Sequence, residues 1–390
     1  MAKLICQRCK SVFDVPHGET CPRCDMKDPH VYPFQNSDDY LNREVPRVLE
    51  ERKRSGLEGL VGGLECVIIN TEPDKQRDTV DEFLRTTGLE VDEAFEDSRH
   101  RTVVLKTEES ADFLVRARKG ETNLFSQYNA FPKSNHLPNT RLETFVFHVH
   151  DIEKYISIQK SRGVRFMTDD ILETDHYRFI QTLPMKSTGT SISVIQWKSE
   201  HGSYASQEAK SLDWAFEKPG AAHLSNIKGL DHTALRVRAK DRDATIIEFM
   251  ELTNYTFDFA IYVKMFNSIT NVARLSDETF AMVFTSGITA YTDDETSGPT
   301  ETFIHNYGTR VHHLAFHTEQ IETTYAALQD NGMKFLIELV GSPQEGLKQT
   351  FSEPSGNTLL VNEYIHRYGD FDGFFTKSNV TRLTEATKKQ

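Results

Sequence analysis

Two long regions of the chain share one pattern, in which short β-rich runs of apolar residues alternate with stretches of helical spacing. In the first region the runs predict strands and the amphipathic stretches predict helices. The predicted strands are residues 64–70, 101–106, 111–117, 143–149, 164–167, 177–182 and 191–197, and the predicted helices are residues 74–86 and 152–161. The later half of this region therefore has the order β-α-β-β-β, and the earlier half is compatible with it.

The second region repeats the pattern further along the chain. The predicted strands are residues 232–237, 311–317, 334–340, 348–352 and 358–365, with further short strands up to about residue 290, and the predicted helices are residues 241–252 and 321–331. Residues 291–300 are polar and turn-like. Helical spacing also predicts a connecting helix over residues 37–55, carried by Leu41, Val45, Val48 and Leu49, and a helix after residue 373, carried by Val380, Leu383 and Ala386.

The two regions also match residue by residue at three places. Gly63-Leu64-Glu65-Cys66 corresponds to Gly229-Leu230-Asp231-His232, at an offset of 166 residues. Residues 147–152 correspond to residues 316–321 at an offset of 169, and residues 189–197 correspond to residues 356–364 at an offset of 167. Three separate matches at nearly one offset indicate an internal repeat.

The repeat and the composition around it predict several domains in this chain of 390 residues. The segment between the two copies is rich in Ser, Ala, Glu and Lys, which indicates a linker that is helical in part around Trp214. The predicted segments are a zinc ribbon (1–30), a connecting helix (31–62), a first domain (63–198), a linker (199–228) and a second domain that ends in a helix (229–390).

Four of the five cysteines form two CxxC pairs, Cys6 with Cys9 and Cys21 with Cys24. Each pair lets two thiolates point at one ion from a tight turn, and together they complete a tetrahedral shell around Zn(II). A disulfide pair or a redox motif is the alternative. Since such a short segment cannot bury a core, the zinc would supply its folding energy. The fifth cysteine, Cys66, is expected to be a small buried residue.

The formal net charge of −13 argues against binding to nucleic acid or to an anionic membrane. No run of about 18 apolar residues predicts a membrane-spanning helix, and residues 1–6 contain no apolar segment of signal-peptide length. We therefore expect a soluble, cytoplasmic protein. Self-association, and a protein partner at the zinc ribbon, are left open by the sequence.

At matched positions the second copy carries His232, His313 and Glu363, where the first carries Cys66, Thr144 and Gln196. Two imidazoles and one carboxylate with open positions are the ligand set of non-haem Fe(II) oxygenases. Because side chains on a strand alternate between faces, His313 and Ala315 share one face, while His312, Leu314 and Phe316 share the face expected to pack on helices. This alternation favours His313 over His312 as the ligand.

Longer motifs in the second copy resemble 4-hydroxyphenylpyruvate dioxygenase. Residues 347–367 are similar to that family's Gln-x-Phe-x-x-Pro stretch and the strand ending Glu-Ile-Ile-Gln-Arg. Residues 311–321 are similar to its Val-Gln-His-Ile-Ala-Leu strand, and Asp231-His232 matches its first histidine strand. Gly373-Phe374 and Asn379 resemble its C-terminal Gly-Phe-Gly-x-Gly-Asn-Phe helix. The motifs cover residues 229–390, and the likeness over residues 63–198 is one of architecture.

This resemblance implies an α+β fold of the vicinal oxygen chelate superfamily, with two domains of paired βαβββ units that form open barrels. It implies Fe(II) bound by His232, His313 and Glu363 in the second domain alone. The implied activity is oxidation of a 2-oxo acid, or a related aromatic acid, with O2. Gln349 matches a family glutamine near the substrate, Asn379 matches the helix motif, and Phe374 or Phe375 matches an aromatic residue over the site.

The chain also departs from that family. Only 50 residues separate His313 from Glu363, the last aromatic of the helix motif is replaced by Val380, and Thr300-Glu301-Thr302 replaces a Ser-Gln-Ile stretch. The zinc ribbon is not a family feature. An extradiol-type ring-cleaving dioxygenase, or another metalloenzyme of the superfamily, is therefore one alternative function, and a non-enzymatic regulator that binds a metal or a small molecule is another. The sequence does not name the substrate.

Overall fold

The structure is a computed structural model, and it describes residues 3–5, 12–14 and 35–390 except residues 121, 278, 370 and 372. The first two of these segments are β1 (Lys3–Ile5) and β2 (Val12–Asp14), which pair in antiparallel fashion. Cys6, Cys9, Cys21 and Cys24 lie outside the described residues. The zinc ribbon therefore stays a prediction.

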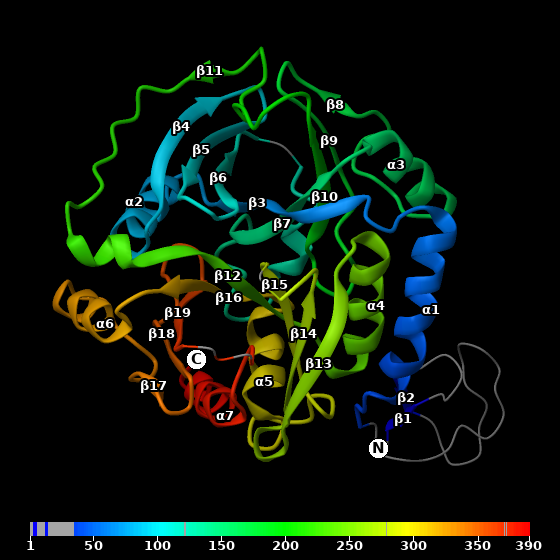
Figure 1. The fold of residues 1–390 in the computed structure, drawn as a ribbon, viewed down its shortest axis with the longest axis vertical. Coiled ribbons are helices and arrows are strands. Elements are labelled where there is room, and N and C mark those ends of the chain that lie inside the picture. The colour runs from blue at the N-terminus through cyan, green and yellow to red at the C-terminus, as the bar shows by residue number, and fades with distance from the viewer. Residues whose placement is uncertain are drawn as a thin grey trace.

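The first copy forms a nine-stranded sheet that curls through the upper half of the molecule in Figure 1. Its spatial order is β11-β4-β5-β6-β3-β7-β10-β9-β8. The strands are β3 (Val61–Thr71), β4 (Glu90–Glu96), β5 (His100–Lys106), β6 (Asp112–Arg118), β7 (Arg141–Val149), β8 (Leu172–Glu173), β9 (Tyr177–Gln181), β10 (Ser191–Trp197) and β11 (Lys210–Ser211). The helices of this copy are α2 (Gln76–Thr86) and α3 (Ile152–Ser161).

The second copy forms an eight-stranded sheet of order β13-β14-β15-β12-β16-β19-β18-β17. The strands are β12 (Ile227–Arg236), β13 (Thr256–Val263), β14 (Ser268–Arg274), β15 (Ala281–Ser286), β16 (Arg310–Thr318), β17 (Val340–Ser342), β18 (Leu347–Phe351) and β19 (Val361–Arg367). The helices are α4 (Arg242–Leu252), α5 (Gly298–Tyr307), α6 (Ile321–Asp330) and α7 (Lys377–Ala386). Short 3-10 turns are η1 (Ser126–Tyr128), η2 (Ala222–Asn226), η3 (Ala239–Asp241), η4 (Lys264–Phe266) and η5 (Thr387–Lys389).

Each sheet consists of two βαβββ units joined through their first strands. In the first sheet β3 pairs in parallel with β6 and antiparallel with β7, and β7 pairs in parallel with β10. In the second sheet β12, β15, β16 and β19 repeat these three pairings. The prediction of an α+β fold with curled sheets is therefore confirmed, and the arrangement is consistent with the vicinal oxygen chelate fold.

One continuous apolar core joins the two copies. Across it the ring of Phe113 stacks on Phe316, with centroids 6.0 Å apart, and Phe147 contacts Phe249 at 5.9 Å. The predicted connecting helix is α1 (Asp39–Ser55), which lies along α4 (Figure 1). Its buried Arg52 donates hydrogen bonds to backbone carbonyls of the second copy, which include those of Met250 and Asn254. The copies are thus packed against each other and held by α1.

Several predicted elements differ from those in the structure. Residues 164–167 and 334–340 contribute little more than the isolated bridges of Phe166 and Phe335, and the polar stretch that ends at residue 300 already contains the start of α5. The last strand begins at Val361 rather than at residue 358, because Leu359 has a left-handed φ of 63°. The linker is not helical around Trp214. In the described part of the chain, no helix is long and apolar enough to cross a membrane.

Candidate metal centre

The three predicted ligands of the second copy meet at one point inside its curled sheet. His232, His313 and Glu363 are buried, and their ligand atoms lie within 4.8 Å of one another. The Nε2 atom of His232 is 3.1 Å from Oε2 of Glu363, and Nε2 of His313 is 3.2 Å from the same oxygen. Two imidazole nitrogens therefore face a single carboxylate oxygen.

The strand register brings these side chains together. β12, β16 and β19 are neighbours, and Ala315 of β16 lies between His232 on one side and Glu363 on the other. Ala234 likewise lies opposite His313. The small alanine side chains leave room on the concave face, so the longer histidine and glutamate side chains can converge there.

A carboxylate orients His232 from behind. Asp231 Oδ1 lies 2.7 Å from Nδ1 of His232, and the guanidinium of Arg367 holds Asp231 at 2.5 Å. Burial alone would lower the pKa of His232, but the neighbouring carboxylates of Glu363 and Asp231 outweigh it and raise that pKa to about 9. A carboxylate on the second nitrogen of a ligating histidine fixes its ring and tautomer, which is common in metal sites.

A chain of amides orients Glu363. Gln349 of β18 donates from Nε2 to Oε1 of Glu363 at 2.6 Å, and Asn379 of α7 donates from Nδ2 to Oε1 of Gln349 at 3.1 Å. Gln349 borders the cavity described below, whereas Asn379 does not. The structure therefore places Gln349 beside the candidate ligands and Asn379 behind it, where it acts through Gln349.

His313 is held by a second histidine that sequence alternation assigned to the opposite face. Nδ1 of His312 lies 2.8 Å from Nδ1 of His313, and Nε2 of His312 lies 2.8 Å from Oε1 of Gln390. The β12–β16 ladder skips His312, since Ala234 pairs with His313 and Leu235 pairs with Val311. This β-bulge breaks the alternation, so the expectation that His312 shares a face with Leu314 is wrong, and His312 instead borders the cavity.

The donor set fits a cation. Burial lowers the pKa of His312 and of His313 well below its usual range, so both rings are neutral. Gln390 Oε1 accepts a hydrogen bond from Nε2–H of His312, so Nδ1 of His312 accepts a hydrogen bond from Nδ1–H of His313. Nε2 of His313 then presents its lone pair to Oε2 of Glu363. Two lone pairs repel unless a cation lies between them. Two imidazoles and one carboxylate are a set that Fe(II) takes in non-haem oxygenases.

Two aromatic rings close the site from the side of α7. The rings of Phe374 and Phe375 lie 5.5 Å and 5.1 Å from that of His232. Phe375 borders the cavity, while Phe374 lies under the guanidinium of Arg367 at 4.8 Å. Of the two aromatic candidates, Phe375 is therefore the one that faces the space next to the histidines.

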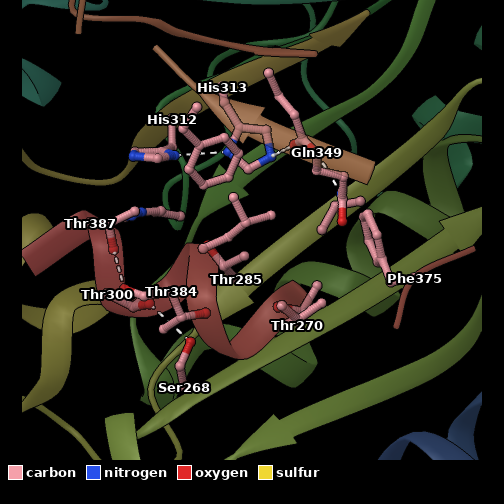
Figure 2. Close-up of a pocket in the computed structure, with 16 residues that line it drawn as sticks. Ser268, Thr270, Thr285, Thr300, His312, His313, Gln349, Phe375, Thr384 and Thr387 are labelled. Carbon is pink, nitrogen blue, oxygen red and sulfur yellow. Dashed lines mark hydrogen bonds and ion pairs between the residues drawn. The ribbon is translucent and has the colours of Figure 1, made fainter. Parts of the chain in front are cut away.

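A cavity of about 50 Å³ adjoins the candidate ligands and is bordered by His313, Glu363 and Gln349. Figure 2 shows His312, His313 and Gln349 along one wall, with hydroxyl-bearing side chains on the other side. Those hydroxyl groups belong to Ser268, Thr270, Thr285, Thr300, Thr384 and Thr387. Helix α7, which contacts β13 and β17 at the two edges of the sheet, covers the cavity.

Sequence reasoning missed most of this lining. Arg236 borders the cavity, and the only sequence signal for it was its period-two spacing from His232 on the same strand. The hydroxyl groups gave no signal, because isolated serines and threonines are common on strands. Asp231 was matched as part of a motif, but its contact with His232 depends on how Arg367 folds back onto it.

The strand register also corrects one counterpart in the first copy. Cys66 pairs with Val146 as His232 pairs with Ala315, so Cys66 and Thr144 do occupy the positions of the two histidines. The residue opposite Val146 on β10 is Ser193, not Gln196. Gln196 lies further along the strand, where it accepts a hydrogen bond from the backbone of Ile152. The first copy thus has a thiol and two hydroxyl groups in place of the trio.

Comparison with known proteins supports the fold of the second copy. Residues 270–361 match the family model described as the Glyoxalase/Bleomycin resistance protein/Dioxygenase superfamily. This match includes His313 but neither His232 nor Glu363. No curated protein matches the sequence significantly.

Two solved structures have a similar fold over most of the chain. A triple mutant of 4-hydroxymandelate synthase from Streptomyces coelicolor matches with a TM-score of 0.62 and 14% identity, over 85% of this chain and 99% of that one. A fusion protein of a xylose isomerase-like TIM barrel with 4-hydroxyphenylpyruvate dioxygenase matches with a TM-score of 0.60 and 14% identity, over 90% of this chain and 58% of the fusion protein. Both copies therefore take part in the shared fold.

Proposed function

We propose that this protein is a non-haem Fe(II) dioxygenase that oxidises a 2-oxo acid, or a related aromatic acid, with O2 in its second copy. The observation that carries the proposal is the convergence of His232, His313 and Glu363 beside a cavity. The motif resemblance to 4-hydroxyphenylpyruvate dioxygenase and the two fold matches point to the same class of reaction.

In this proposal the chain positions the reactants. When bound, Fe(II) would supply a Lewis acid for the 2-oxo acid and the electrons that O2 chemistry needs. Glu363 and the two histidines occupy one side and leave the cavity side free for the substrate. Asp231, Gln349 and His312 hold the three donors in place. One oxygen atom of O2 ends in the carboxylate that remains after CO2 leaves, and the other ends in the oxidised product.

The burial of the candidate ligands serves the same chemistry. Phe375 and helix α7 border the cavity beside the candidate ligands, which are buried, and neutral His312 offers no proton at the back of His313. A dry site prevents the loss of reactive oxygen species to solvent and strengthens electrostatic interactions with a charged substrate.

The test is anaerobic loading with Fe(II), followed by O2-uptake and CO2-release measurements with a panel of 2-oxo acids. We expect one Fe(II) per second copy and matched consumption of O2 and release of CO2 with at least one acid. Failure to bind Fe(II) at the trio, or binding without coupled CO2 release from any acid, would overturn the proposal.

An extradiol-type ring-cleaving dioxygenase is the second candidate, favoured by the short separation of His313 and Glu363. Catechols belong in the same assay, because ring cleavage gives a yellow product without CO2. Glyoxalase-type chemistry fits less well: such sites commonly add a fourth protein ligand, and among the described residues the group of possible donors contains three.

A regulator that acts through the predicted zinc ribbon is a further alternative. Deletion of residues 1–30 should abolish the role of such a regulator, whereas a dioxygenase should keep its turnover.

A further inference from the structure

Arg236 is a buried cation at the cavity, and no acidic side chain in the described part of the chain neutralises it. It is 3% exposed, donates from Nη1 to the carbonyl of Pro299 at 3.2 Å, and its guanidinium lies 4.3 Å from the ring centroid of Phe303. Over the residues that the structure describes, no Asp or Glu forms an ion pair with it. A buried charge without a counterion is costly, so such a group points to a ligand that supplies the opposite charge.

Other arginines in the interior have different surroundings, and Arg310, which donates to the carbonyl of Thr140, resembles Arg236 in its lack of an ion pair among the described residues but does not border the cavity. Arg242 pairs with Asp38 and Asp243, and Arg118 pairs with Glu143 at 2.6 Å. Arg141 also lacks an acid within hydrogen-bond distance, but it donates to Asn129 and to two backbone carbonyls, and it does not border the cavity. Arg236 differs because it combines burial, the lack of an acid and an open side toward the cavity.

The position of Arg236 sets where the missing anion would lie. It follows His232 by four residues on β12, a separation of about 13 Å between Cα atoms at ~3.3 Å per residue. Its contacts with Pro299 and Phe303 place the guanidinium beside the start of α5, where Thr300 borders the cavity. Of the three candidate metal ligands, His313 and Glu363 border the same cavity. A single ligand can therefore reach both.

The formal charges of the site indicate what that ligand carries. Among the described residues that line the cavity, Arg236 is the only side chain that is positively charged at neutral pH, and Glu363 is the only carboxylate. With Fe(II) at the trio the fixed charges are −1 from Glu363, +2 from the metal and +1 from Arg236, which leaves +2. A 2-oxo acid with one carboxylate neutralises half of this excess, whereas a substrate with two carboxylates neutralises all of it.

We propose that the substrate is a small 2-oxo acid with a second carboxylate, which binds Arg236 while the 2-oxo acid end faces His232, His313 and Glu363. This inference rests on the proposed function and specifies its substrate class. The hydroxyl groups of Ser268, Thr270 and Thr300 lie on the cavity wall and can donate to the second carboxylate. A carboxylate fits better than a phosphate, because one cation and a cavity of about 50 Å³ suit a small group of single charge.

The test compares substrates of equal chain length. Binding of 2-oxoglutarate and 2-oxopentanoate, and of 2-oxoadipate and 2-oxohexanoate, is measured by anaerobic calorimetry on the Fe(II)-loaded protein, with KM from O2 uptake. We expect the diacid of at least one pair to bind on the order of 10- to 100-fold more tightly, as for a hydrogen-bonded charge pair. Arg236→Met should abolish this preference, while Arg236→Lys should retain part of it. Inorganic phosphate should not displace the diacid.

Several outcomes would overturn the inference. These are equal or tighter binding of the monoacids, an unchanged preference in Arg236→Met, or displacement by phosphate at the concentration of the diacid. If Arg236→Met fails to fold by circular dichroism, Arg236→Lys decides, since a purely structural arginine would lower stability without changing the ratio between diacid and monoacid.

Titrations without metal distinguish a failure of this inference from a failure of the proposed function. Glutarate and butyrate are titrated into protein without Fe(II) and into His313→Ala. A glutarate preference that depends on Arg236 while Fe(II) fails to bind would leave the anion subsite standing and overturn the dioxygenase. CO2 release from monoacids, with no preference for diacids, would support the dioxygenase and overturn the anion subsite at Arg236.

Discussion

The two copies share a sheet topology but differ in what fills the concave side. In the second copy the interior holds His232, His313 and Glu363 beside a cavity, and α7 closes it. In the first copy the linker after β10 brings Tyr204 inside, where its ring lies 5.3 Å from Trp197 and its hydroxyl donates to Asp112 at 2.9 Å. The same curled sheet therefore surrounds a candidate site in one copy and a packed core in the other.

This comparison shows that strand geometry alone does not make the site. Both copies bring three interior positions together, and both ladders skip one residue, His312 in the second copy and Glu143 in the first. Glu143 forms an ion pair with Arg118, whereas His312 forms a hydrogen bond with His313. The identity of a few side chains, and of the segment that closes each curled sheet, therefore distinguishes the copy with the candidate site from the other.

Removal of a candidate ligand should have the largest effect. Glu363→Gln should reduce Fe(II) affinity by more than the roughly 10- to 100-fold that loss of an outer partner costs, because it removes the negative charge of the trio. Its matched control is Ser193→Ala at the corresponding position of the first copy, which should leave iron binding unchanged. Equal iron loss in both variants would contradict the assignment of the site to the second copy. Iron content and calorimetry measure both.

Loss of the buried ring of Tyr204 should lower the stability of the first copy and leave iron binding unchanged. Tyr204→Ala removes a large buried ring and should lower the free energy of unfolding by about 3 kcal/mol. Fe(II) binding per folded chain should remain. Met265→Ala, at a side chain that is 75% exposed, is the control and should change stability by less than about 0.5 kcal/mol. Denaturant unfolding checks the difference, and a loss of iron from folded Tyr204→Ala would count against separate roles of the copies.

The partner of Glu363 should matter less than Glu363 itself. Gln349→Leu removes the donor at 2.6 Å and should lower Fe(II) affinity by roughly 10- to 100-fold. Gln181→Leu is the comparison in the first copy, where Gln181 donates to Thr144 at 2.8 Å, and it should leave iron affinity at the wild-type value. If Gln349→Leu binds iron as tightly as the wild type, Gln349 does not position Glu363.

The histidine behind His313 should give the smallest of these effects. His312→Leu leaves Nδ1 of His313 without its partner and should weaken Fe(II) binding by about 10-fold. His312→Gln should restore most of the affinity if the amide oxygen can accept from His313. Gln390→Ala should be milder, since it acts one step further away. Equal affinity in His312→Leu and His312→Gln would show that tautomer control is not the role of His312.

Sequence periodicity predicted much of the fold, because the apolar positions of each strand mark the face that is buried. The order β-α-β-β-β was predicted for the later half of the first copy, and His313 was favoured over His312 by alternation. The bulge at His312 could not be predicted, since it depends on the ladder with β12. The same holds for Ser193 in place of Gln196, because the pairing of β7 with β10 sets that position.

The polar half of the cavity lay beyond sequence reasoning for a different reason. Ser268, Thr300 and Thr384 come from β14, α5 and α7, which are distant in sequence and meet only through the way α7 closes the sheet. Arg236 could have been flagged, since it shares a strand face with His232, but its lack of an acidic partner is a property of the folded chain.

The most direct test of the account is anomalous diffraction from crystals of the protein grown with Fe(II) under anaerobic conditions. The account predicts one iron peak in the second copy, bonded to Nε2 of His232, Nε2 of His313 and a carboxylate oxygen of Glu363, and no peak beside Cys66, Thr144 and Ser193. An iron peak in the first copy, or the absence of iron from the trio in crystals that contain Fe(II), would contradict it.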